Sequence, residues 1–332
     1  MQIDAAAPIC LLIVQMRIIT NQLPQFPAKR AIKTVGRFPL FRPRCYCWHV
    51  GVARMQVAMG HAKMQRSQGS ALVSFAHRMG QTRLVDLHQS GSGKAIMPRT
   101  HGGTPEVVFL NTSGGITDGD SLNFCMELGA NGKLIATTQT AERAYASRGA
   151  AGKAVVTAAV GAGAHLDWVP QETILYDHCH LVRQTTIDLA GDASCLLCES
   201  VVLGRHAMGE DPAHARLTDH RMIRRDGRPV WADTVRIDAD VLARRDSPAL
   251  MGRARCFAVV VLVAIGAATL LPALRRVLDQ PGTLSAASAW GEKCVLRILA
   301  CDSWPLKLQI VRALGVLRQG ALPRVWQMQE PR

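Results

Sequence analysis

Short runs in which apolar and polar residues alternate dominate the chain from residue 68 onward. Leu122, Phe124, Met126 and Leu128 alternate with polar or small residues, a period of two that predicts a half-buried β-strand. Further strands are predicted at residues 69–75, 82–88, 106–110, 133–138, 154–160, 165–169, 181–189, 195–203, 221–225, 228–237, 257–263 and 291–300. No helical pattern alternates with the strands before residue 257, so the sequence predicts a mainly β fold with a large antiparallel body.

Two dipeptides predict tight hairpin turns, because each suits the positive φ angles that such turns need. Asn131-Gly132 is predicted to fold strand 133–138 back onto the strand that ends at Leu128. Asp226-Gly227 is predicted to join strands 221–225 and 228–237 in the same way.

Helical spacing occurs only near the C-terminus. Residues 267–278 and 305–317 fit a period of 3.6, and the second segment places Leu306, Ile310 and Leu314 on one face. The prediction is therefore about two C-terminal helices packed on the β body.

Residues 1–64 differ from the rest in composition. The first 63 hold nine Lys or Arg against one acid, Asp4, and contain no serine. We interpret residues 1–64 as a disordered or non-native leader with translation starting later, and residues 65–332 as one domain. Cys45, Cys47 and His49 form a small cluster in this leader, which we interpret as accidental.

The net charge of +14 does not indicate a nucleic-acid partner. Without the first 63 residues it falls to +6, and the body has neither a dense basic stripe nor the aromatic residues that stack on bases. The ten cysteines are irregularly spaced, which favours a reducing, cytoplasmic location over a disulfide scaffold. No segment reaches the length of a membrane span, so neither a membrane nor a nucleic acid is an expected partner.

Several motifs, separated along the chain, resemble those of the urease accessory protein UreD family (also called UreH), in the family's order. They are the glycine-rich acidic turn Asn111–Asp120, the polar run Thr137–Arg143, the segment Trp168–Asp177, the run Gly204–Glu210, the turn Arg225–Gly227 and the closing Leu322–Trp326. The resemblance extends from about Gln65 to the C-terminus.

This resemblance implies a two-layer, β-rich scaffold that is not itself an enzyme. Family members bind apo-urease and the accessory protein UreF, which in turn docks the GTPase UreG. The resemblance also implies that nickel passes through a polar interior to the urease active site. The expected metal is transient nickel, with no tightly bound cofactor and no catalytic residue.

A passage of this kind needs oxygen ligands that bind nickel weakly and release it. The matching positions predicted to serve are Asp120, Thr138, Glu172, Asp177, Glu199 and Glu210. Glu172 and Glu199 lie in apolar segments, so their side chains either point outward or line an internal polar space. Arg143 and Arg205 are the predicted polar partners of these two acids.

Two other clusters suggest metal chemistry less strongly. Residues 178–180 read His-Cys-His, and in a strand only His178 and His180 would share a face and a metal ion. Cys195 and Cys198 form a CxxC without a second pair at zinc-finger spacing, so we interpret them as core cysteines.

Two alternative functions remain open at this point. One is a hydrolase that uses a pair of carboxylates, as in glycoside cleavage, although the few aromatic residues offer little platform for a sugar. The other is a plain β-rich adaptor without a metal passage.

Overall fold

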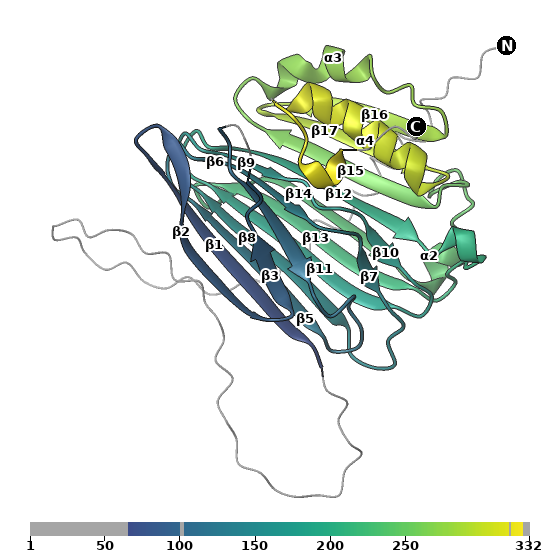
Figure 1. Cartoon of the computed structure of the whole chain (residues 1–332). Coiled ribbons are helices and arrows are strands. Elements are labelled where there is room, and N and C mark those ends of the chain that lie inside the picture. The colour runs from purple at the N-terminus through teal and green to yellow at the C-terminus, as the bar shows by residue number, and fades with distance from the viewer. Residues whose placement is uncertain (1–65, 100–102, 319, 328–332) are drawn as a thin grey trace, which may run out of the picture. The chain divides into compact units, whose positions relative to one another are not determined.

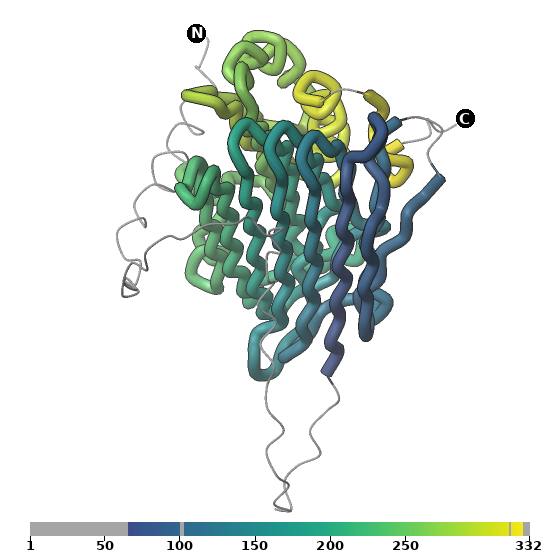
Figure 2. The backbone as a smooth tube through the Cα atoms, turned by 90° about the vertical axis from the view of Figure 1, so that its left-hand side faces the viewer, coloured from purple at the N-terminus to yellow at the C-terminus, as the bar shows by residue number. Residues whose placement is uncertain are grey.

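A computed structural model describes residues 66–99, 103–318 and 320–327, which form two β-sheets and a layer of helices (Figure 1). The predicted leader, with Cys45, Cys47 and His49, lies outside the described residues. The seven-stranded sheet has the order β14-β13-β11-β8-β5-β1-β2 (Figure 2). Its strands are β1 (Gln68–Arg78), β2 (Gln81–Gly91), β5 (Ser121–Leu128), β8 (Gly152–Val160), β11 (His180–Leu189), β13 (Arg216–Arg225) and β14 (Arg228–Ile237).

The second sheet has ten strands, eight of them in the order β16-β17-β15-β12-β9-β6-β4-β3, with β10 joining β12 to β7 beside this path. Its strands are β3 (Gly93–Ile96), β4 (Glu106–Asn111), β6 (Lys133–Thr138), β7 (Glu142–Ala144), β9 (His165–Trp168), β10 (Thr173–Leu175), β12 (Ser194–Leu203), β15 (Cys256–Val263), β16 (Thr283–Trp290) and β17 (Lys293–Ala300). The sequence patterns missed β3, β7, β10 and β16.

The prediction of an antiparallel body is wrong for the central strands. In the seven-stranded sheet β5, β8, β11 and β13 run parallel to one another, and in the ten-stranded sheet β4, β6, β9 and β12 do the same. Parallel neighbours normally need a helix for the return path. Here the return path is a strand of the opposite sheet, so the chain winds between the two layers. The absence of helices therefore did not imply antiparallel pairing.

The predicted hairpin at Asn131-Gly132 is wrong for the same reason. Asn131 does take a positive φ of 59°, but β5 belongs to the seven-stranded sheet and β6 to the ten-stranded one. The turn is an arc that carries the chain across the core. Both strands still direct apolar residues to one core, so alternation could not distinguish an arc from a hairpin.

The hairpin prediction at Asp226-Gly227 is confirmed. Asp226 and Gly227 have φ values of 48° and 77°, and β13 and β14 pair antiparallel with Arg225 opposite Arg228. The strands predicted at 69–75 and 82–88 are confirmed as β1 and β2, which pair antiparallel across the turn at Met79 and Gly80.

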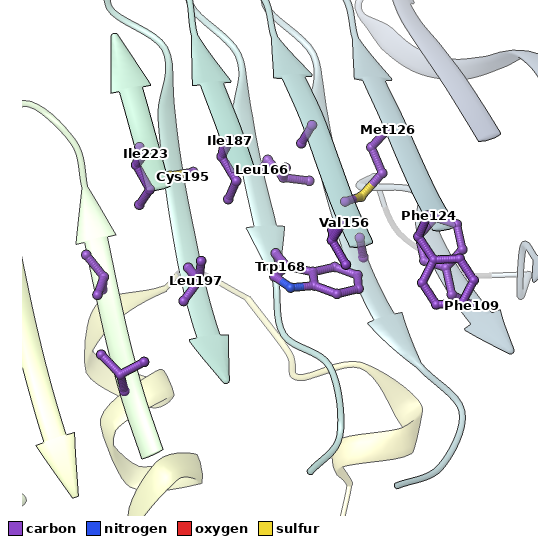
Figure 3. Packing of buried hydrophobic residues seen from close by; sticks show 14 of the residues in the cluster. Phe109, Phe124, Met126, Val156, Leu166, Trp168, Ile187, Cys195, Leu197 and Ile223 are labelled. Atoms are coloured by element: carbon purple, nitrogen blue, oxygen red, sulfur yellow. The ribbon is translucent and has the colours of Figure 1, made fainter. Parts of the chain in front are cut away.

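A continuous apolar core lies between the two sheets (Figure 3). Phe109 of β4 stacks on Phe124 of β5 with ring centroids 4.6 Å apart, and it meets the edge of Trp168 of β9 at 6.1 Å. These rings join strands of both sheets. Burial of each such side chain contributes about 1.5–3 kcal/mol, which ties the two layers together.

A second apolar cluster covers the outer face of the ten-stranded sheet. Helix α4 (Ser303–Leu317) begins at Asp302, whose carboxylate accepts from the Trp304 amide at 2.9 Å, and packs its apolar face on β15 and β17. This confirms the second predicted helix. The first is shorter than predicted, because a 3₁₀ turn at Ala267–Leu270 precedes the helix α3 (Leu271–Arg275). The remaining short helices are α2 (Ala239–Ala243) and the 3₁₀ turns His206–Met208 and Arg324–Trp326.

The described part of the chain contains no helix that is both long enough and apolar enough to cross a membrane.

The closing segment is anchored by one aromatic side chain. Trp326 is 2% exposed, belongs to the outer apolar cluster, and donates from Nε1 to the Val169 carbonyl at 2.8 Å. We expect Trp326→Ala to lower the free energy of unfolding by about 3–5 kcal/mol, measured by urea denaturation. Trp304→Ala is the matched control, because Trp304 is 52% exposed and should cost about 0.5 kcal/mol or less. Equal losses from both changes would contradict this account of the outer cluster.

Candidate functional site

The segment from Gln171 to Asp177, with β10 at its centre, joins most of the predicted site residues. Its backbone pairs with β12 on one side and β7 on the other. The Gln171 amide donates to Thr138 Oγ1 at 2.9 Å, and the Glu172 carbonyl accepts from the Glu142 amide at 2.9 Å. Arg183 Nη1 donates to Thr173 Oγ1, also at 2.9 Å. We call residues 171–177 the β10 segment.

A small cavity lies beside the start of the β10 segment. Its walls include Phe109, Asn111, Thr138, Glu142 and Arg143. The carboxylate of Glu142 accepts from Asn111 Nδ2 at 3.3 Å and from the Arg143 amide at 3.1 Å. Burial raises the pKa of Glu142 to about 7, so this carboxyl group exchanges its proton near neutral pH.

On the other side of β10, six charged side chains lie between the sheets, five of them buried and Arg297 partly buried. They are Arg183, Glu199, Asp219, Arg221, Asp233 and Arg297. Strand register explains the grouping: Arg183 lies opposite Asp219, Arg221 opposite Asp233, and Val259 lies between Glu199 and Arg297. We call these six residues the inter-sheet charge network.

The network balances three arginines with three acids, and its contacts are close. Arg183 Nη2 lies 2.6 Å from Asp219 Oδ2, Arg221 Nε lies 2.7 Å from Glu199 Oε2, and Arg297 Nη2 lies 2.7 Å from Asp233 Oδ1. Arg221 also donates to Asp219 and, at 3.1 Å, to Asp233. Pairing of this quality is what allows ionised groups to remain in an apolar interior.

Glu199 points inward and is fully engaged by its neighbours. Besides Arg221, it accepts from Thr185 Oγ1 at 2.6 Å and Trp168 Nε1 at 3.1 Å. Burial alone would raise its pKa, but the charges of Arg183 and Arg221 outweigh burial and lower the pKa to about 2. Glu199 is therefore ionised at neutral pH, and an incoming cation would have to displace an arginine to reach it.

The end of the β10 segment meets the run Gly204–Glu210 in a second polar contact. The Asp177 amide donates to Glu210 Oε1 at 3.1 Å, and Glu210 Oε2 accepts from Arg205 Nε at 2.7 Å. The pKa of Glu210 is lowered, although its partial burial acts in the opposite direction, because Arg205 and the two backbone amides stabilise its charge.

The predicted partnership of Arg143 and Arg205 with Glu172 and Glu199 is wrong for Glu199. Arg205 pairs with Glu210, and Arg143 donates to the Gly114 carbonyl at 3.4 Å. Arg183 and Arg221 hold Glu199 instead, because strand register brings them to its level inside the core.

Asp120 lies apart from the β10 segment, and its contacts hold the acidic turn in shape. Its two carboxylate oxygens accept from the Ser67 amide at 2.7 Å and the Thr117 amide at 2.9 Å. The turn packs tightly, since a Cβ added at Gly115 would lie 2.3 Å from the Tyr145 ring. These contacts account for the acidic turn without a bound ion.

The structure groups one of the two histidines predicted to share a metal with other residues. His178 lies in the turn that precedes β11 and meets Asp177 and His214, whereas His180 is the first residue of the strand and is outside this group. Cys195 and Cys198 are core residues on opposite faces of β12, as predicted, and burial raises the pKa of both thiols.

Comparison with known proteins supplies the decisive observation about identity. The sequence model of the UreD urease accessory protein family matches residues 67–327. The chain belongs to the UreD family.

The matches to named relatives in the family cover nearly the whole length of each relative. The chain is 49% identical to the urease accessory protein UreD of Paracoccus denitrificans, over 82% of this chain and 96% of the relative. It is 50% identical to that of Cereibacter sphaeroides, over 80% and 96%, and 36% identical to that of Rhizobium etli, over 82% and 100%.

Family membership places the chain among accessory proteins in urease maturation, which assist an enzyme rather than being one. The resemblance inferred from separated motifs is therefore confirmed. The hydrolase alternative loses support for a geometric reason as well, because Glu199 is held by arginines and is not available as a general acid or base.

Sequence reasoning missed Glu142 and five of the six network residues. A signal existed for Arg183. It lies on the same face of the strand as the core residues Leu181 and Ile187, so its side chain had to point inward with theirs. No comparable signal existed for Glu142, because its burial depends on pairing between β7 and a three-residue strand that the pattern did not predict.

The network predicts that replacing two different arginines of β13 will destabilise the fold to very different extents. Arg221→Met should lower the free energy of unfolding by about 3–5 kcal/mol, since it leaves buried carboxylates short of a partner. Arg224→Met is the control: its ion pair with Asp188 is about half exposed and should contribute about 0.5 kcal/mol. Chemical denaturation measures both, and a near-neutral Arg221→Met would refute the pairing described above.

The raised pKa of Glu142 predicts how the stability of the fold changes with pH. Its pKa rises from 4.5 to about 7 on folding, so the folded chain binds more protons than the unfolded chain between these values. Its contribution to stability therefore falls as pH rises through this window. We expect Glu142→Gln to raise the free energy of unfolding by about 1–3 kcal/mol at pH 8 and to leave it nearly unchanged at pH 4. Glu292→Gln is the control, because the same substitution on an exposed turn shows its effect without burial. An equal gain in stability from Glu142→Gln at both pH values would contradict the prediction.

Proposed function

We propose that the chain is a non-catalytic scaffold that binds apo-urease and the UreF–UreG complex and passes nickel through its polar interior. Family membership supports the maturation role. The proposal on nickel rests on one observation, that polar oxygens lie at both ends of the β10 segment: Thr138 and Glu142 line the cavity at its start, and the Glu210 carboxylate accepts from the Asp177 amide at its end.

Oxygen donors of this kind suit an ion that must move on. Thiolates bind nickel-like metals strongly, whereas hydroxyl and carboxylate oxygens hold them more weakly. Cys179 is buried beside the same segment, and burial raises the pKa of its thiol to about 11, which weakens its competition for the metal because the thiol must lose a proton to bind.

Within this proposal the predicted residues divide into two groups. Thr138, Glu142 and Glu172 offer oxygens to the ion, with Asp177 and Glu210 at the far end of the segment. Glu199 contributes through the charge and rigidity of the inter-sheet network rather than as a ligand, because arginines occupy its oxygens. Asp120 has no part in the route.

A cytoplasmic location belongs to the same proposal. Six of the described cysteines are free thiols, which suits a reducing compartment: Cys179, Cys195, Cys198, Cys256, Cys294 and Cys301.

The test separates scaffolding from nickel transfer. The full chain with Thr138→Val, Glu142→Gln and Glu172→Gln is co-expressed with apo-urease, UreF, UreG and the remaining maturation proteins. We expect affinity capture to recover the complex at normal yield, while the nickel content of urease and its activity both fall. Thr138→Val removes a donor oxygen, each Glu→Gln change removes the carboxylate charge and one oxygen, and all three preserve side-chain size.

The control variant carries Asp188→Asn and Glu292→Gln, two half-exposed acids outside the β10 segment. It should mature urease normally. If the triple variant also loads urease with nickel normally, the passage is refuted and the plain adaptor remains. If the unmodified chain does not associate with these partners, the scaffold proposal fails as well.

A further inference from the structure

Two loops that are distant in sequence emerge side by side at one edge of the seven-stranded sheet. β11 and β13 are parallel neighbours, and His180 lies opposite Arg216 at their first residues. The turn that leads into β11 carries Asp177 and His178, and the loop that leads into β13 carries His214. Strand register therefore fixes the three side chains near one another.

Their donor atoms converge on a single carboxylate oxygen. His178 Nε2 and His214 Nδ1 each lie 3.5 Å from Asp177 Oδ2. The two imidazole rings stack with centroids 4.5 Å apart and planes 6° from parallel. One donor atom from each of the three residues fits within a mutual separation of 4.8 Å.

The carboxylate is held in place by its other oxygen. Asp177 Oδ1 accepts from the amides of Ala213 at 3.0 Å and His214 at 2.7 Å, which also ties the two loops together. The Asp177 amide is in turn bound by Glu210. Oδ2 is the oxygen that faces both imidazoles.

The backbone at His178 carries an unfavourable conformation. Its φ is +59°, in the left-handed region that a glycine would occupy with less strain. The His178 carbonyl accepts from the Ser147 amide at 2.9 Å, which helps to keep the turn in this form. This turn conformation directs the His178 imidazole toward a second imidazole and a carboxylate.

We propose that Asp177, His178 and His214 form a binding site for a divalent transition-metal ion. Two imidazole nitrogens and one carboxylate oxygen are a donor set that suits borderline ions such as Ni²⁺, Zn²⁺ and Cu²⁺. Both rings are more than half exposed, so a bound ion loses little of its hydration and keeps water in its remaining coordination positions. The proposal does not depend on the interior nickel passage.

The surroundings of the site moderate its affinity. The pocket beside the two rings is also lined by Ser147 and Arg216, and the guanidinium charge opposes a bound cation. A site with this balance exchanges its metal with solution instead of retaining it as a structural ion does.

The experiment compares metal binding by the full chain and its variants. Ni²⁺ and Zn²⁺ binding is measured by competition with a chromophoric chelator, and Cu²⁺ loading is followed by electron paramagnetic resonance for nitrogen hyperfine structure. The variants are His178→Gly, His214→Ala and the double change, and His206→Ala with His220→Ala is the control at two exposed histidines outside the cluster. Cys45, Cys47 and His49 are present in every variant, so the comparison isolates the proposed site.

We expect the double variant to bind one metal ion fewer than the unmodified chain and to lose the two-nitrogen copper signal, while the control keeps both. His178→Gly relieves the backbone strain, so its melting temperature should not fall and loss of binding would not reflect unfolding. Asp177→Asn keeps an oxygen for the two amides but removes the charge, and should weaken binding. Equal stoichiometry and unchanged copper spectra in the double variant would overturn the proposal.

Discussion

The charges buried between the two sheets constrain the rest of this fold. Each arginine and acid of the inter-sheet charge network needs its partners at bonding distance, and those partners come from strands of both layers. A slip of one residue in β11 would turn Arg183 out of the core and leave Asp219 without it. The apolar core holds the sheets together, but the network allows only one register between them.

The β10 segment shows how this rigidity reaches the polar interior. β10 has only three residues, yet its hydroxyl at Thr173 bonds to the network through Arg183, and its backbone holds β7 with Glu142. Upstream, Gln171 accepts from Lys307 of α4 at 2.8 Å and so connects to the outer layer as well. A strand too short to be stable alone is fixed by contacts on every side, which places its polar neighbours with little freedom.

The sequence predicted local features better than the path between them. Alternation identified β5 and the turn chemistry identified Asp226-Gly227, because both depend on neighbouring residues. Whether β5 and β6 share a sheet depends on contacts such as Phe109 against Phe124, which no local pattern contains. The same limit applied to the site. The motif around Glu172 was recognisable, but the partners of Glu199 and the burial of Glu142 arise only when strands from distant parts of the chain are placed side by side.

The two ends of the β10 segment carry different metal donors, with oxygen atoms near its start and two imidazole nitrogens near its end. Asp177 belongs both to the surface cluster with its two imidazoles and, through its amide, to the contact with Glu210. Imidazole nitrogen binds nickel-like ions more strongly than hydroxyl or carboxylate oxygen does. An ion taken up at the surface would therefore not move inward by affinity alone, and net transfer would require a stronger final acceptor, as a metalloenzyme active site provides. If nickel moves along the β10 segment as proposed, the surface site would set how often an ion is available there, and the partner that receives the ion would set the direction of transfer.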